Sequence, residues 1–118
     1  MGDTTLEIET ESAGRYRNAT EADLHRLFSQ LGAETGGYLI LERADLPEQY
    51  AQTALEVKPK PSLHATGRYV VEYRDGPHSH HQAFTEDASV VFDVLAGWAF
   101  DRPGWRDLVA WQPLDLGF

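Results

Sequence analysis

The feature that most constrains the fold is a run of strand-like segments between two amphipathic helical segments. Four stretches, residues 38–43, 50–57, 68–74 and 80–84, are β-prone or alternate between apolar and polar side chains. No helical periodicity separates them. Strands joined by turns pair antiparallel, whereas a parallel sheet needs a crossover segment between its strands. We therefore expect a mainly antiparallel sheet.

Two segments carry the spacing of an amphipathic helix. The first is expected to start after Thr20, whose hydroxyl stands three residues before the carboxylate of Asp23, and to close at Gly32. The second is expected to be capped by Thr85, with acidic residues in its first turn, and to end before Pro103. The apolar stripes comprise Leu24, Leu27, Phe28 and Leu31 in the first helix, and Ala88, Val91, Phe92, Leu95, Trp98 and Ala99 in the second.

The remaining segments complete the order strand, helix, four strands, helix, strand. Residues 4–10 alternate as a half-buried strand, and residues 108–111 form a short last strand stopped by Pro113. Residues 58–62 contain two prolines and are expected to form a loop between neighbouring strands. This order predicts one α+β domain over residues 1–118, with a mostly antiparallel sheet of about six strands and two helices packed on one face.

The charge balance limits the partners of the chain. Ten basic and 19 acidic residues give a net charge of −9, which repels nucleic-acid phosphates and anionic lipids and favours a basic partner. Acidity that only maintains solubility is the alternative. We expect a cytoplasmic protein, because no signal-peptide pattern and no membrane-spanning apolar stretch occur. The absence of cysteine excludes disulfides and thiolate metal sites, and no cofactor is expected.

Three histidines near one turn are the candidate metal ligands. His78, His80 and His81 lie close in sequence to Asp75, and imidazoles with a carboxylate can bind zinc, nickel or copper. On a strand, however, His80 and His81 point to opposite faces, so only one of them can share a site with His78. The alternative interpretation is a solvated hairpin loop.

Paired carboxylates are the other candidate for catalysis. Glu42, Glu56 and Glu72 lie on strands expected to be close in the sheet, where aligned glutamates can act as acid and base. A solvated sheet face with mixed Arg and Glu explains the same pattern without chemistry. The sequence contains no Gly-x-Ser-x-Gly elbow and no phosphate-binding glycine fingerprint.

The three tryptophans lie near the end of the chain. Trp98 falls on the apolar stripe of the second helix, and Trp111 falls on an apolar terminal strand, so both are expected in the core. Trp105 follows a turn and is flanked by Arg102 and Arg106. A partly exposed tryptophan in that setting is typical of an interface hot spot.

The block from Tyr69 to Trp111 resembles one known family. It reads Tyr-Val-Val-Glu-Tyr-Arg-Asp-Gly, a histidine-rich return strand, a Thr-capped helix ending near Leu95-Ala96-Gly97-Trp98, then Pro103 and a strand closing on Trp111. This pattern is similar to small α+β immunity proteins of bacterial polymorphic-toxin systems, and the composition resembles that of actinobacterial proteins. The resemblance implies a protein that binds and neutralises a toxin enzyme, such as a deaminase or nuclease. It implies no catalytic residues.

The leading hypothesis is a non-enzymatic binding protein with a basic protein partner. The candidate contact residues are Glu7, Glu9 and Glu11 near the first strand, together with Glu72 and Trp105. One alternative is a small-molecule or metal-dependent enzyme that uses the three histidines and the strand glutamates. A second alternative is a structural subunit of a larger complex.

Overall fold

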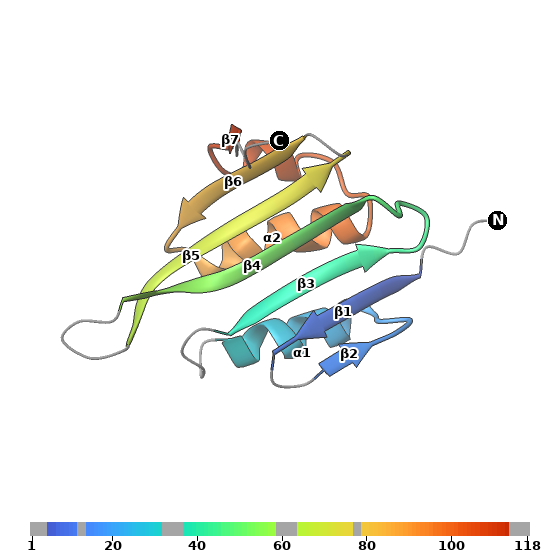
Figure 1. Ribbon diagram of the computed structural model, residues 1–118, viewed down its shortest axis with the longest axis horizontal. Helices are drawn as coiled ribbons and strands as arrows, with labels where there is room; N and C mark the ends of the chain where they lie inside the picture. The colour runs from blue at the N-terminus through green and yellow to red at the C-terminus, as the bar shows by residue number, and fades with distance from the viewer. Residues whose placement is uncertain (1–4, 12–13, 32–36, 59–63, 77–78, 114–118) are drawn as a thin grey trace.

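A seven-stranded antiparallel sheet in the order β2-β1-β3-β4-β5-β6-β7 forms one layer, and two helices lie against one of its faces (Figure 1). The computed structural model describes residues 5–11, 14–31, 37–58, 64–76 and 79–113. Within these residues, no helix is long and apolar enough to cross a membrane. The elements are β1 (Leu6–Thr10), β2 (Gly14–Tyr16), α1 (Glu21–Leu31), β3 (Tyr38–Arg43), β4 (Gln49–Lys58), β5 (His64–Asp75), β6 (His80–Thr85), α2 (Ala88–Ala99), the short 3-10 helix η1 (Trp105–Asp107) and β7 (Gln112–Pro113).

The α+β class and the antiparallel pairing are as the sequence predicts, but the sheet has one strand more than expected. The added strand, β2, is a three-residue edge strand paired with β1, and its first residue, Gly14, has a φ of 76°. It contains no apolar alternation, so the sequence gives no signal for it. Its Arg15 lies opposite Glu9.

The last strand was predicted in the wrong place. Residues 108–111 form no strand, and β7 consists of Gln112 and Pro113 at the edge of the sheet. The chain first makes η1, entered through Gly104 at a φ of 89°. Trp105 in η1 packs directly over Gly97, which holds this segment on α2 before the chain reaches β6.

The two helix starts show why one cap was predicted correctly and the other was not. In α1, Thr20 and Asp23 bond reciprocally, with backbone N–H to side-chain oxygen distances of 2.9 and 3.2 Å. In α2, the cap is Asp87 and not Thr85, which belongs to β6. The Asp87 carboxylate accepts from the Ser89 hydroxyl and backbone N–H, and these bonds hold the pKa of Asp87 below its usual value.

The helices bury one face of the sheet, which we call the covered face. Alternate residues of each strand point into this layer, because successive side chains of a strand face opposite ways. Full burial of each large aliphatic side chain contributes roughly 1.5–3 kcal/mol. The largest fully buried side chains are Leu6, Ile8, Leu39, Leu41, Thr53 and Val71 from the sheet, and Leu24, Leu27, Val91, Val94 and Leu95 from the helices.

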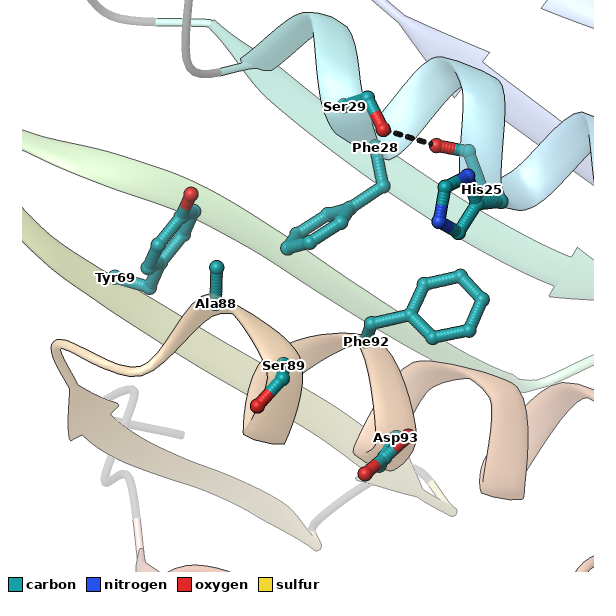
Figure 2. Close-up of a pocket in the computed structure, with 8 residues that line it drawn as sticks. All are labelled: His25, Phe28, Ser29, Tyr69, Ala88, Ser89, Phe92 and Asp93. Atoms are coloured by element: carbon teal, nitrogen blue, oxygen red, sulfur yellow. Dashed lines mark hydrogen bonds between the residues drawn. The ribbon is translucent and has the colours of Figure 1, made fainter.

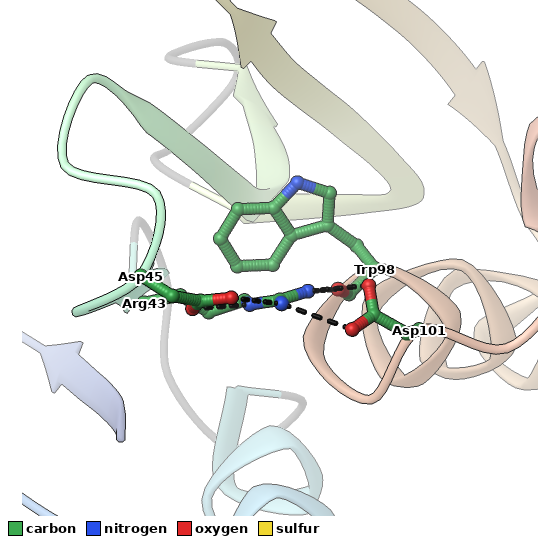
Figure 3. Close-up of polar contacts among 4 residues, drawn as sticks. All are labelled: Arg43, Asp45, Trp98 and Asp101. Carbon is green, nitrogen blue, oxygen red and sulfur yellow. Dashed lines mark hydrogen bonds and ion pairs between the residues drawn. The ribbon is translucent and has the colours of Figure 1, made fainter. Parts of the chain in front are cut away.

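One arginine closes the end of this buried layer (Figure 3). Arg43, 5% exposed, donates to the Trp98 carbonyl oxygen at 2.9 Å and to both carboxylate oxygens of Asp101 at 2.8 and 3.0 Å. It also donates to Asp45 at 2.5 and 3.0 Å. The two carboxylates raise the pKa of Arg43. Arg43 therefore ties the end of β3 to the end of α2 as a permanently charged group.

Candidate functional site

The opposite face of the sheet, which we call the open face, has neither helix over it (Figure 1). The antiparallel register sets its side chains in rows that cross β3, β4, β5 and β6. The first row is mainly apolar, the second is polar and the third is mixed in charge. The rows are Tyr38–Ala54–Val70–Phe84, Ile40–Gln52–Glu72–Gln82 and Glu42–Tyr50–Arg74–His80.

A hollow of about 270 Å³ lies in the middle of the open face. It exists because Ala54, the smallest side chain of the apolar row, stands between Tyr38 and Val70. We call it the sheet hollow. The open-face side chains that line it are Tyr38, Ile40, Gln52, Ala54, Val70 and Glu72.

The side-chain donors around the sheet hollow are hydrogen-bonded to neighbouring carboxylates. Gln52 Nε2 donates to Glu72 Oε2, and the Tyr38 hydroxyl donates to Glu9 Oε2 at 3.4 Å. Burial, with the negative charge of Glu9, raises the pKa of Tyr38, so its hydroxyl stays a donor at neutral pH. The wall therefore presents mainly acceptors to an incoming group: the Glu72 carboxylate and the Gln52 carbonyl oxygen.

The carboxylates of the open face differ in whether a cation neutralises them. At the β2 edge, Arg15 pairs with Glu9 at 2.6 Å and Arg17 pairs with Glu7 at 3.2 Å. By contrast, Glu42 and Glu72 have no arginine or lysine nitrogen within 4.0 Å among the residues that the structure describes. Glu42 and Glu72 therefore form no direct ion pair there, although Arg15 acts on Glu42 at longer range and Arg74 lies on the same face as Glu72.

A second concavity, of about 450 Å³, lies on the other side of the molecule between α1 and α2 (Figure 2). We call it the helix cleft. Phe28 and Phe92 face each other across it with ring centroids 6.0 Å apart, and Tyr69 lies 5.7 Å from Phe28. The His25 ring meets Phe92 edge-on at 5.3 Å. This volume falls within the range of about 300–1,000 Å³ that is usual for small-molecule pockets.

The structure does not bring the predicted contact residues onto one surface. Glu7, Glu9 and Glu72 lie on the open face, and Glu11 is exposed in the turn after β1. Trp105 lies on the helix-covered side, half-buried, with its ring 5.0 Å from Tyr73. Three of the four predicted glutamates therefore lie on the open face, while Trp105 packs against the core.

The histidines are separated by the strand, as predicted. His80 is buried on the open face near Tyr50, at 6.2 Å between rings, whereas His81 stacks on Tyr73 of the covered face at 4.8 Å. His78 lies outside the described residues. Over the described part of the chain, no group of three or more His, Cys, Asp or Glu is arranged to hold a metal ion.

Sequence reasoning missed both concavities for the same reason. In the sequence, Phe28 and Phe92 belong to the apolar stripes of two helices and are expected in the core. Ala54 only weakens the strand pattern of residues 50–57. A stripe predicts which side of a helix is apolar, but it does not set the separation of two helices. The position of a small residue opposite larger ones depends on strand register, which is a long-range property.

Comparisons of the chain with protein-family models, with curated proteins and with solved structures find no significant match. The resemblance of residues 69–111 to immunity proteins thus stays an expectation from the sequence. What the structure adds is a position for those residues: Val70 and Glu72 line the sheet hollow, and Phe84 ends its apolar row.

Proposed function

We propose that the chain is a non-enzymatic binding domain whose open face docks a basic protein, in the manner of an immunity-type inhibitor. One observation carries this proposal. The open face combines a row of apolar side chains with central carboxylates, Glu42 and Glu72, that have no cationic partner among the described residues. Such a face can bury apolar area against a partner and bind its cationic side chains at the same time.

The extent of the open face favours a protein over a small molecule. Its rows cross four strands, each about 4.8 Å from the next. Phe84, at 44% exposure, adds a large apolar side chain to the end of the first row. Aromatic and aliphatic side chains surrounded by polar groups are typical of surfaces that lose water on association.

The charge of the chain favours a partner that itself binds nucleic acid. Enzymes that act on nucleic acids hold phosphates with lysine and arginine, so their active faces are basic. An inhibitor with a net charge of −9 is attracted to such a face and shields it. A toxin deaminase or nuclease, which the resemblance implies, is a partner of this kind.

The test is affinity purification from the source cell with three baits: wild type, Phe84→Asp and Leu108→Asp. Leu108 is the matched control, because it is 45% exposed, against 44% for Phe84, but follows η1 on the helix-covered side. We expect a basic protein to be retained by wild type and by Leu108→Asp, and to be lost with Phe84→Asp. A gene for a toxin domain beside the gene for this chain would identify that protein.

Three results would overturn the proposal. One is a partner that Phe84→Asp retains and Leu108→Asp loses, which would place the interface on the helix side. The other is sedimentation of the purified chain as a dimer that Phe84→Asp dissociates, because the open face would then bind a second copy. Finding no partner protein at all would contradict it equally.

A second candidate function, small-molecule binding, is favoured by the helix cleft alone. Its aromatic walls and volume suit a ligand with an apolar body. Ala88→Trp, at an exposed position that lines the cleft, would fill it without entering the core. Ligands from a metabolite library that raise the melting temperature of wild type and not of Ala88→Trp would support this function.

A further inference from the structure

We propose that the sheet hollow is the receptor for one arginine side chain of the partner protein. This inference rests on the proposed function, because it names the group that anchors the partner to the open face. The hollow holds about 270 Å³, just below the usual lower limit of about 300 Å³ for small-molecule pockets. A space of that size suits a single side chain inserted from a facing protein.

The walls match the two halves of an arginine. Ile40, Val70 and the ring of Tyr38 provide apolar surface for the methylene stem, and Ala54 leaves room for it. Burying the methylenes against this surface removes apolar area from water. Long cationic side chains bury their stems along apolar surface in this way while the charged head meets polar groups.

The polar side of the hollow is suited to a ligand group that donates hydrogen bonds. The Tyr38 proton and one Gln52 amide proton are already given to Glu9 and Glu72. An anionic or acceptor group entering here would meet the Glu72 carboxylate and the Gln52 carbonyl oxygen unfavourably. A cationic donor would bond to both.

Arginine fits this pair of acceptors better than lysine. The guanidinium is planar and presents several N–H groups in a fixed fork, so it can reach a carboxylate and a neighbouring carbonyl together. Lysine offers a compact charge that is more strongly hydrated.

The electrostatic balance of the open face supports a cation at this place. Glu72 has no arginine or lysine nitrogen within 4.0 Å among the described residues, although Arg74 lies on the same strand and face. The Arg74 guanidinium Nε donates to the Gly76 carbonyl oxygen at 3.0 Å instead. An incoming guanidinium therefore gains a carboxylate that no described cation within ion-pair distance competes for.

The test is a titration of ¹⁵N-labelled protein with N-acetyl-arginine amide, followed by backbone chemical shifts. N-acetyl-citrulline amide is the control ligand, because it has nearly the same shape and no charge. We expect arginine to shift the amides of residues 38, 52, 54, 70 and 72, with an affinity at least about tenfold above that of citrulline, the factor that corresponds to losing a hydrogen bond to a charged group.

Three variants locate the binding. Ala54→Leu fills the hollow and Glu72→Gln removes its charge, and each is expected to abolish the arginine shifts. Glu48→Gln removes an exposed carboxylate in the turn between β3 and β4 and should leave them unchanged. Equal binding of citrulline, tighter binding of N-acetyl-lysine amide, or arginine shifts that survive Ala54→Leu would overturn the inference.

The same variants separate this inference from the proposed function. If a partner is captured through Phe84 but is bound equally by wild type, Ala54→Leu and Glu72→Gln, the function holds and the arginine receptor is wrong. If arginine binds the hollow and no partner is captured, the function is wrong and the site is real. If both hold, replacing the bound arginine of the partner should weaken binding at least as much as Glu72→Gln does, and Glu72→Gln should add little further loss in that background.

Discussion

The two faces of the sheet are built from the same strands and use them differently. In β3, Leu41 points to the covered face and is fully buried, while its neighbour Ile40 points to the open face and lines the sheet hollow. The covered face is filled by large aliphatic side chains under two helices. The open face mixes apolar, amide and charged side chains. The difference indicates that stability is concentrated on one face and that the other stays exposed, as the proposed docking requires.

The largest expected difference in stability is between substitutions of the two neighbours Leu41 and Ile40. Leu41→Ala should lower the free energy of unfolding by about 2–5 kcal/mol, because it leaves a cavity in a packed layer. Ile40→Ala should cost less than about 1 kcal/mol, since it removes a side chain already in contact with water. Urea unfolding of both variants, compared at equal m-values, measures this. Similar losses would mean that something covers the open face in the isolated chain.

The next difference concerns two arginines. Arg43→Ala should cost about 2–3 kcal/mol, because the buried guanidinium makes bonds to charged groups that join β3 to α2. Asp45 and Asp101 remain in contact with water, which limits the loss. Arg74→Ala, on the open face, should change stability by less than about 0.5 kcal/mol. A reversed order in thermal unfolding would show that the Arg43 contacts contribute little.

A smaller effect is expected where the C-terminal segment meets α2. A Cβ added at Gly97 would lie 2.5 Å from Trp105 Cβ, so Gly97→Ala must push η1 away. We expect a loss of about 1–2 kcal/mol, in the lower part of the overpacking range because η1 is at the surface. Tryptophan fluorescence should shift to longer wavelength as Trp105 gains exposure. An unchanged spectrum and stability would contradict this packing.

The covered face could largely be predicted from sequence, and the open face only in outline. The apolar stripes of the two helices correctly marked the side that packs on the sheet, and strand parity correctly separated His80 from His81. Such predictions need only local periodicity. The sheet hollow depends on the register of strands joined by loops, and the role of Arg43 depends on residues far along the chain. Those contacts form only when the whole sheet is assembled.

The smallest expected effect is a pH dependence at the end of the covered face. Hydrogen bonds from Arg43 hold the pKa of Asp45 below its usual value. A carboxyl with a depressed folded-state pKa stabilises the fold above its unfolded pKa of about 3.9, and this stabilisation is lost as pH falls through the folded-state pKa.

The stability difference between wild type and Asp45→Asn should therefore be present at neutral pH and shrink below about pH 4. Because the Asp45 side chain is 38% exposed, solvent screening keeps the difference small. The same substitution in an Arg43→Ala background is the control. A pH-dependent difference that persists in that background would assign the effect to a partner other than Arg43. The Arg43–Asp45 ion pair would then not contribute to the stability of this end of the covered face.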